Sequence, residues 1–345
     1  MNRKNLIILI LFFLIMIGAG IAYRFLYTEP EPEIMDNLEV VFPGAEISAL
    51  FDDGDFLWVG TADGIYLLGR DTGEIRRKLD SDIQMIYAAM IVQTNDGLIW
   101  AGHDAGLSAF DKAGTEMLRF RKPEIPGGRV NTILAADEGL WIGTQEGAAF
   151  LEKDDSGWKV SEILTQKNGL TEEVVQVIAR VEEEIWFGAY LAQDKGGISI
   201  RSEGGWQYLS TEEGIPHRYI NAILPLSDQK VLIGSGQLIY GGLSLAEKSG
   251  EGWKITENWN QEDGIPGMKV RCLFLDSTGR LWITTEADGI LILDSPDRLD
   301  ERPLKGILAK QENGLADDEV KCIVECDNCF WLGGKYGLTR FGKGE

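Results

Sequence analysis

The stretch VRCLFLDSTGRLWITTEADGILILD, residues 270–294, decides the fold of this chain. It contains three short apolar runs, and the polar, glycine-containing segments between them are typical of tight turns. The middle run begins with Leu281 and Trp282, and nearly the same letters return as LWVGTADGIYLL at residues 57–68 and LWIGTQEGAAFL at residues 140–151. The stretch is therefore one unit of an internal repeat.

The aromatic anchor of this repeat returns every 41 to 50 residues along the chain. The seven anchor positions are Trp58, Trp100, Trp141, Trp186, Leu232, Trp282 and Trp331. A period of this length, built from short strands, is typical of a propeller in which each repeat forms one blade. Four strands bounded by Gly and Asp turns fit into each repeat. We therefore predict an all-β fold, a seven-bladed β-propeller of four-stranded antiparallel blades.

The tryptophans at the anchor positions are predicted to be core residues rather than a row that stacks on a ligand. A single blade cannot bury both of its faces, and a buried aromatic side chain contributes on the order of 150–250 Å² of contact area. The last repeat ends after three strands, whereas a strand-like run at residues 34–41 precedes the first repeat. We predict that this run supplies the outer strand of the seventh blade and closes the ring.

The N-terminal segment is predicted to lie outside the propeller, which spans residues 34–345. Residues 6–23 carry no charge and are long enough to cross a bilayer as a helix. Basic residues precede this stretch and mostly acidic ones follow it, so the positive-inside bias places residues 1–5 in the cytoplasm. Residues 24–33 then form a linker. We expect a single-pass protein of the cell membrane with an extracytoplasmic propeller; a cleaved signal peptide is the alternative.

Composition argues against several classes of function. The chain has 33 Lys and Arg against 55 Asp and Glu, a formal net charge of -22, so it would meet nucleic-acid phosphates with like charge. Its only two histidines, His103 and His217, disfavour a multi-histidine metal site. No phosphate-binding glycine loop or metal-ligand spacing is present. We predict no nucleic-acid partner and no cofactor.

The repeat resembles that of the two-component regulator propeller family, found in extracytoplasmic sensor regions of bacterial hybrid histidine kinases. Residues 270–294 and ISALFDDGDFLWVGTADGIYLL at residues 47–68 carry the resemblance most closely, and it extends over about residues 34–345. It implies a sensor-like, ligand-binding propeller. Members of the family usually carry a kinase, and the sequence shows no kinase here, so any signalling output is expected to come from a partner.

Candidate ligand-binding residues lie in the loops around one mouth of the central channel. In a propeller, the loops entering the first strands share a face with those joining the second and third strands. The candidates in these loops are Arg129, Tyr219, Lys269, His217, Arg218, Tyr190, His103 and Lys335. They predict a site for a polar small molecule, an oligosaccharide or a peptide, bound by tyrosine stacking, hydrogen bonds and charge. The alternatives are that they face water, or that Glu46 and Glu319 neutralise the cations in a structural ring.

Two further functions remain open at this point. The propeller would also suit an assembly platform for exported protein partners. A lyase or hydrolase would need a general base, such as His103 or His217, beside a carboxylate such as Glu172, Glu286 or Glu319. The two histidines come from nearly opposite sides of the predicted ring, so we predict that the chain is not an enzyme.

The four cysteines are all close to the C-terminal end of the chain. Cys326 and Cys329 flank a two-residue turn, and in an exported chain they are candidates for a disulfide. A second CxxC is missing, which argues against zinc. Cys272 and Cys322 occupy the same slot of consecutive repeats. We expect them to pack as small residues near the axis, with an inter-blade disulfide as the alternative.

Overall fold

The computed structural model describes residues 37–80, 83, 90–237 and 239–343. The chain divides into two compact units, Met1–Glu33 and Ile34–Glu345, and only the second contains described residues. The predictions for residues 1–5, 6–23 and 24–33 therefore lie outside the described residues. Within the described ranges, no helix combines the length and the apolar character that crossing a membrane requires.

The described strands form seven four-stranded antiparallel sheets, which confirms the predicted seven-bladed propeller. Blade 1 consists of β2 (Ile47–Asp52), β3 (Phe56–Thr61), β4 (Gly64–Gly69) and β5 (Ile75–Lys78), and blade 2 of β6 (Ile91–Gln93), β7 (Ile99–His103), β8 (Gly106–Phe110) and β9 (Glu116–Phe120). Blade 3 consists of β10 (Val130–Ala136), β11 (Gly139–Thr144), β12 (Gly147–Asp154) and β13 (Gly157–Leu164), and blade 4 of β14 (Val175–Val181), β15 (Glu184–Ala189), β16 (Ile198–Ser202) and β17 (Gly205–Leu209).

Blade 5 consists of β18 (Ile220–Pro225), β19 (Lys230–Gln237), β20 (Tyr240–Ser249) and β21 (Gly252–Trp259), and blade 6 of β22 (Val270–Leu275), β23 (Leu281–Thr285), β24 (Ile290–Leu293) and β25 (Ile307–Ala309). Blade 7 consists of β26 (Val320–Glu325), β27 (Cys329–Gly334), β28 (Gly337–Gly342) and β1 (Leu38–Val40). Short 3₁₀ helices lie between strands as η1 (Gln166–Asn168), η2 (Gln261–Asp263), η3 (Pro296–Asp300) and η4 (Gln311–Asn313).

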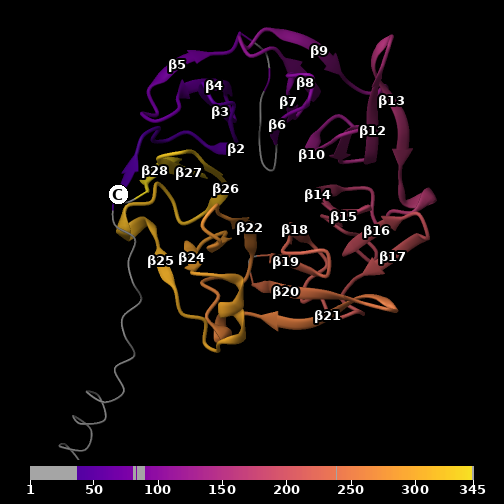
Figure 1. The fold of residues 1–345 in the computed structure, drawn as a ribbon, viewed down its shortest axis with the longest axis vertical. Helices are drawn as coiled ribbons and strands as arrows, with labels where there is room; N and C mark the ends of the chain where they lie inside the picture. Colours follow the sequence, from indigo (N-terminus) through magenta and orange to yellow (C-terminus); the bar gives the residue numbers. More distant parts are fainter. Residues whose placement is uncertain (1–36, 81–82, 84–89, 238, 344–345) are drawn as a thin grey trace, which may run out of the picture. The chain divides into compact units, whose positions relative to one another are not determined.

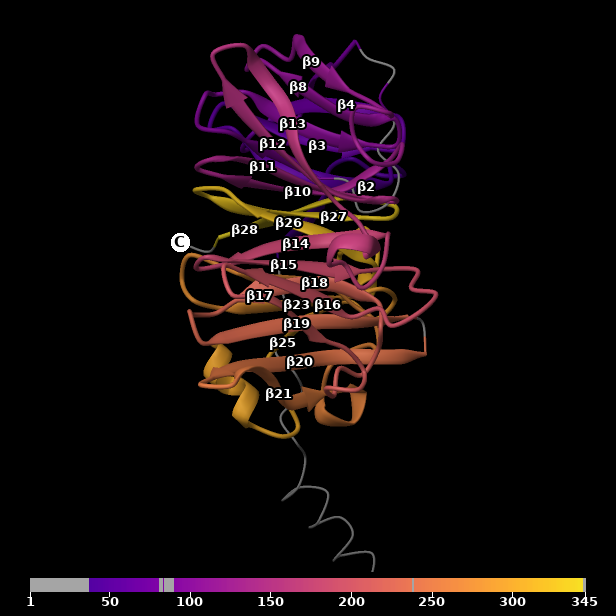
Figure 2. The same cartoon turned by 90° about the vertical axis from the view of Figure 1, so that its right-hand side faces the viewer.

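The first strand of each blade lies nearest the ring axis, and the later strands lie progressively outward (Figure 1). Seen from the side, the strands run along the ring axis, so that each begins on one face and ends on the other (Figure 2). The loops that enter the first strands therefore share a face with the loops that join second and third strands. We call this face the mouth face.

The ring is closed by a strand from the start of the propeller, as predicted. Strand β1 pairs antiparallel with β28, with Leu38 opposite Phe341 and Val40 opposite Thr339. The backbone N–H of Val41 then donates to the carbonyl of Leu338 at 2.9 Å, which continues the pairing beyond the strand. The outer edge of β28 is thereby covered by the other end of the propeller.

The anchor tryptophans are buried between neighbouring blades, which confirms the prediction that they are core. Trp282 of blade 6 is fully buried and packs against Phe330 of blade 7, with ring centroids 4.7 Å apart. Trp186 of blade 4 packs in the same way on Trp253 of blade 5 at 4.8 Å. Leu232, which replaces the aromatic in the fifth copy, is also fully buried.

An Asp in the first hairpin of the repeat accepts hydrogen bonds both from the turn and from the anchor tryptophan. The carboxylate of Asp276 accepts from the backbone N–H groups of Thr278 and Arg280, each at 3.0 Å, and from the indole Nε1 of Trp282 at 2.9 Å. Asp53 accepts from Trp58 in the same manner at 2.6 Å. The motif therefore satisfies a buried indole N–H that would otherwise lack a partner.

Blade 7 lacks this aspartate, and its first hairpin carries the CxxC pair instead. Trp331 donates its indole N–H to the carbonyl of Arg70 in blade 1 at 2.9 Å. The backbone N–H of Cys326 donates to the carbonyl of Cys329 at 2.8 Å, so the two-residue turn is as predicted.

Cys326 and Cys329, the candidates for a disulfide, are both free cysteines in this structure. Their thiols are joined by a hydrogen bond, which together with burial raises the pKa of Cys326, while the same bond lowers the pKa of Cys329. Cys272 and Cys322 are likewise free, so the inter-blade disulfide is not present either.

Candidate functional site

A β-bulge at the start of the innermost strands places polar side chains on the channel wall. In six blades the pairing of the first and second strands skips the second residue of the first strand, as at Asn131 between Val130 and Thr132. The skipped residues are Ser48, Asn131, Gln176, Asn221, Arg271 and Lys321. We call them the bulge ring. All six are polar, and all six line the central channel.

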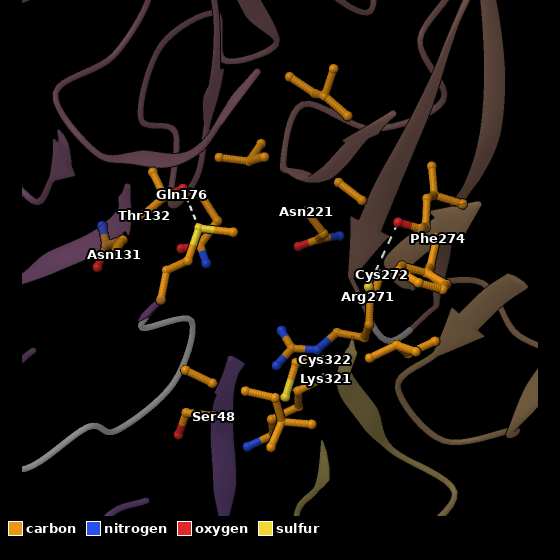
Figure 3. A pocket seen from close by; sticks show the side chains of 18 of the residues that line it. Ser48, Asn131, Thr132, Gln176, Asn221, Arg271, Cys272, Phe274, Lys321 and Cys322 are labelled. Atoms are coloured by element: carbon orange, nitrogen blue, oxygen red, sulfur yellow. Dashed lines mark hydrogen bonds between the residues drawn. The ribbon is translucent and has the colours of Figure 1, made fainter. Parts of the chain in front are cut away.

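The lower part of the channel is a cavity of about 330 Å³, which we call the shaft. The bulge ring lines it together with small residues one position further along the strands, among them Cys272 and Cys322. The guanidinium of Arg271 extends into the middle of this space, and the carboxamides of Asn131 and Asn221 lie on other sides of it (Figure 3).

The upper part of the channel is a second cavity of about 420 Å³, which we call the mouth. Asn131, Gln176, Arg271 and Lys321 line both cavities, so the mouth and the shaft are parts of one channel. The described residues that line the mouth and carry a charge are Glu46, Arg129, Lys269, Arg271, Glu286, Glu319, Lys321 and Lys335. Among them, five cations against three carboxylates give a positive excess on a protein of net charge -22.

Lys269 is the most buried of the predicted site residues that line the mouth. Its side chain is 5% exposed, and its Nζ pairs with Glu286 Oε1 at 2.9 Å and contacts the hydroxyl of Tyr190 at 3.4 Å. The other carboxylate oxygen of Glu286, Oε2, is buried and has no hydrogen-bond partner. An unpartnered buried acceptor costs free energy, and a hydroxyl or ammonium group of a ligand would satisfy it.

Three aromatic rings lie next to Lys269 on the blade 4 and blade 5 side of the mouth. Tyr190 packs on Tyr219 with ring centroids 5.0 Å apart, and Tyr219 packs edge-on against His217 at 4.8 Å. Tyr190 lines the mouth itself, whereas Tyr219 supports it from behind. Burial, followed by the charges of Arg218 and Lys269, lowers the pKa of His217, so its ring is neutral at neutral pH.

The loop that carries Tyr190 is the insertion of the fourth blade, and a buried carboxylate holds it. Glu172 is 6% exposed, and its Oε1 accepts from the backbone N–H groups of Asp194 at 2.8 Å and Gly196 at 3.2 Å. Arg218 donates to the carbonyl of Asp194 at 3.4 Å from the other side. Glu172 is therefore a positioning residue for the loop rather than the partner of a catalytic histidine.

Four of the five cations named above are paired with carboxylates, but Arg129 and Lys269 do not pair with the glutamates that the sequence suggested. Arg129 pairs with Asp104 at 2.8 Å, and Lys269 pairs with Glu286. Glu319 pairs with Arg271 at 3.1 Å, and Glu46 pairs with Lys321. The two glutamates expected to neutralise Arg129 and Lys269 instead neutralise the bulge-ring cations.

The other predicted site residues separate into two groups. Lys335 lines the mouth and is exposed, with its Nζ 5.2 Å from the ring centre of Tyr336. His217 and Arg218 line a neighbouring cavity of about 480 Å³ between blades 4 and 5.

His103 was wrongly placed at the mouth by the sequence analysis. It ends β7 and is 1% exposed, and its Nε2 lies 3.0 Å from the hydroxyl of Ser108 inside blade 2. Its Nδ1 accepts from the backbone N–H of Ala105, and Ser108 in turn donates to Glu116, so the imidazole serves a local polar network. A strand-ending residue in a propeller can turn inward between sheets, and this one does.

Residues 264–287 match the family described as Two component regulator propeller, which confirms the predicted resemblance. No curated protein sequence matches the chain. Among solved structures, the extracellular domain of a hybrid two component system from B. thetaiotaomicron is 18% identical with a TM-score of 0.69, and the match covers 90% of this chain and 40% of that one. The corresponding domain of a second such system from the same organism is 20% identical with a TM-score of 0.64, covering 86% and 39%.

A catalytically inactive virginiamycin B lyase from Staphylococcus aureus, solved with quinupristin, is also similar, at 15% identity and a TM-score of 0.65, covering 89% of this chain and 99% of the lyase. At these identities the likeness shows a shared propeller fold. The chain spans about two fifths of the length of the two extracellular domains. The chain therefore carries the repeat of the two-component regulator propeller family, set in a seven-bladed β-propeller.

Proposed function

We propose that this chain is a membrane-anchored, extracytoplasmic, sensor-like propeller that binds a polar ligand in the mouth and performs no chemistry on it. The ligand is a polar small molecule, an oligosaccharide or a peptide. The uncharged stretch at residues 6–23 supports the anchor. The extracellular regulator domains that share the fold support a sensing role.

One observation carries the binding proposal: the arrangement of Tyr190, Lys269 and Glu286 at the mouth. The tyrosine offers an aromatic face, the lysine is a buried cation, and the glutamate keeps a buried oxygen without a partner. Ligand sites in proteins are concave and combine apolar or aromatic surface with a few convergent polar groups. A structural ion pair alone does not require the neighbouring tyrosine or the unpartnered oxygen.

The proposal is tested by screening the purified full chain against soluble oligosaccharides, short peptides and organic acids. Thermal shift identifies binders, and calorimetric titration then measures their affinity. We expect Tyr190→Ala and Lys269→Met each to weaken binding of the tightest ligand at least tenfold, because each removes a direct contact. For the charged contact of Lys269 the loss is about 1.5–3 kcal/mol.

Tyr208→Ala is the matched control. Tyr208 lies on the outer strand β17 of the same blade and is 43% exposed, so its replacement should leave the affinity unchanged. Absence of any binder in the three classes, or a binder whose affinity is the same for Tyr190→Ala and the wild type, would overturn the proposal.

An assembly platform for an exported protein partner is the second candidate, favoured by apolar side chains exposed on the mouth face. Leu191, Ile239, Tyr240 and Tyr336 are 56%, 74%, 68% and 54% exposed, and all lie in or beside loops that join second and third strands. The double substitution Ile239→Ser and Tyr240→Ser separates the two functions. It should abolish capture of a protein partner, whereas it should leave a ligand of the mouth bound.

A further inference from the structure

The shaft differs from the mouth in the charges of the side chains that line it. Among the described residues that line it, the charged ones are Arg271 and Lys321, and none is Asp or Glu. The remainder of the bulge ring consists of Asn131, Gln176, Asn221 and Ser48, which are uncharged hydrogen-bonding groups. Two cations thus face a cavity of about 330 Å³ at the centre of a strongly acidic protein.

Both cations are largely removed from bulk water. The side chain of Lys321 is 6% exposed and that of Arg271 is 13% exposed. Two like charges that share a cavity repel each other more strongly as the effective dielectric falls. Glu46 and Glu319 relieve this repulsion from the mouth side only, because they line the mouth and not the shaft.

The guanidinium of Arg271 is not saturated by protein groups. Its Nη2 pairs with Glu319, while its Nε is buried and has no hydrogen-bond partner. Figure 3 shows the guanidinium pointing into the open centre of the shaft rather than along its wall. A guanidinium directed into a cavity is suited to charge-assisted hydrogen bonds with an anion, which its outer N–H groups would donate.

The two cysteines of the shaft do not oppose this charge. Burial raises the pKa of Cys272 to about 11 and raises that of Cys322 as well, so both thiols are neutral at neutral pH. The shaft wall therefore keeps its positive excess over the physiological pH range.

We propose that the shaft binds the oxyanion group of a small anionic ligand, held by Arg271 and Lys321 and oriented by the carboxamides of the bulge ring. Carboxylate, sulfate and phosphate share the required chemistry. The inference rests on the proposed function, because the shaft opens into the mouth, and it adds that the ligand of the mouth extends an anionic group into the shaft. Small inorganic and organic anions can enter the shaft without contacting Tyr190. Their binding therefore tests the shaft independently of ligand binding in the mouth.

The test is a titration of the purified full chain with sodium sulfate, sodium phosphate and sodium citrate at constant ionic strength maintained with sodium chloride. We expect saturable thermal stabilisation and calorimetric binding by at least one of the three. Citrate alone would assign a carboxylate ligand, and sulfate or phosphate alone would assign a tetrahedral oxyanion. No response to any of the three salts, or stabilisation that rises without saturation for all three, as exclusion of these anions from the protein surface would give, would overturn the proposal.

The location is tested with variants of the bulge ring. Arg271→Gln should weaken binding at least tenfold. Gln176→Glu is the second variant: it is nearly isosteric, keeps every ion pair, and should weaken binding similarly by adding a negative charge to the shaft wall. Lys112→Gln, at an exposed turn outside the channel, should bind like the wild type. Undiminished affinity in Gln176→Glu would overturn the assignment, even if Arg271→Gln failed to fold.

A second readout reports on the shaft directly. Cys272 and Cys322 line it, so a bound oxyanion should slow their alkylation by N-ethylmaleimide, measured on peptides by mass spectrometry. Cys326 is buried in the first hairpin of blade 7, away from the channel, so its alkylation requires general opening of the protein and serves as the internal reference. Equal slowing of all the cysteines would indicate a general stabilisation and would contradict a site in the shaft.

Discussion

The substitution Asp276→Asn tests whether the aspartate of the repeat holds the blade together. The side chain of Asp276 is fully buried, and its carboxylate accepts hydrogen bonds from Thr278, Arg280 and Trp282. Burial alone would raise the pKa of this carboxyl, but the hydrogen bonds outweigh burial and lower it from 3.8 to about 2. A carboxyl with this change on folding contributes about 2 kcal/mol to the free energy of unfolding at neutral pH.

The sign of the pH dependence follows from the lowered pKa. The contribution of Asp276 is complete above about pH 4, where the unfolded chain is ionised, and it is lost as the pH falls toward 2. Asparagine cannot supply it at any pH. Urea unfolding followed by tryptophan fluorescence should therefore show the variant about 2 kcal/mol less stable than the wild type at pH 7. That difference should shrink as the pH is lowered through 4 toward 3.

The exposed Asp294 provides the matched control, and Asp294→Asn should unfold at the wild-type urea concentration at every pH. An Asp276→Asn protein as stable as the wild type at pH 7 would refute the capping role. A stability difference that stays constant down to pH 3 would refute the electrostatic part of the reasoning.

Three further predictions concern the ring, the loop and the membrane. Starting the chain at residue 43 instead of 34 removes β1 and uncovers β28. It should lower Tm by about 3–5 °C, since roughly 2–3 kcal/mol of packing and hydrogen bonds is lost; an unchanged melting curve would contradict the closure. Glu172→Ala should speed amide exchange at residues 190–196 and weaken binding in the mouth, because the loop loses two hydrogen bonds. Glu173→Ala, at the next position, should change neither the exchange nor the binding; equal exchange in Glu172→Ala and the wild type would show that the carboxylate does not hold the loop. A reporter active only after export should give signal when fused to Glu345, and signal from a cytoplasm-only reporter at that position would reverse the predicted topology.

The repeat made the fold predictable from sequence. The anchor positions at Trp58 and Trp282 recur with the same flanking turns, and a buried aromatic with a capped indole leaves little freedom in the second strand. Closure by residues 38–40 was equally readable, because the last repeat is one strand short. The anchor pattern recurs in most repeats, and the closure follows from the strand count of the last one.

The site was less predictable because it depends on where single side chains turn. Sequence reasoning placed Lys269 and Tyr190 correctly, but it put His103 in the mouth although its ring turns inward to Ser108. It also overlooked Arg271 and Lys321, which a strict two-residue alternation does not direct to the channel. The β-bulge changes that alternation by one residue.

A signal for the bulge ring was present in the sequence. The residue that follows the first Val or Ile of the innermost strand is polar in six repeats. A polar residue at the same position of several otherwise apolar strands indicates a shared polar environment. By contrast, nothing in the sequence showed that Glu46 and Glu319 pair with the bulge-ring cations. Those contacts join residues from different blades.

The most direct test of the account is a crystal structure of the full chain with the tightest binder from the oligosaccharide, peptide and organic-acid screen. The account predicts that the ligand lies in the mouth, with a polar group within hydrogen-bond distance of Lys269 Nζ or Glu286 Oε2 and its body against the ring of Tyr190. A ligand bound on another surface, with only water between Lys269 and Tyr190, would contradict it.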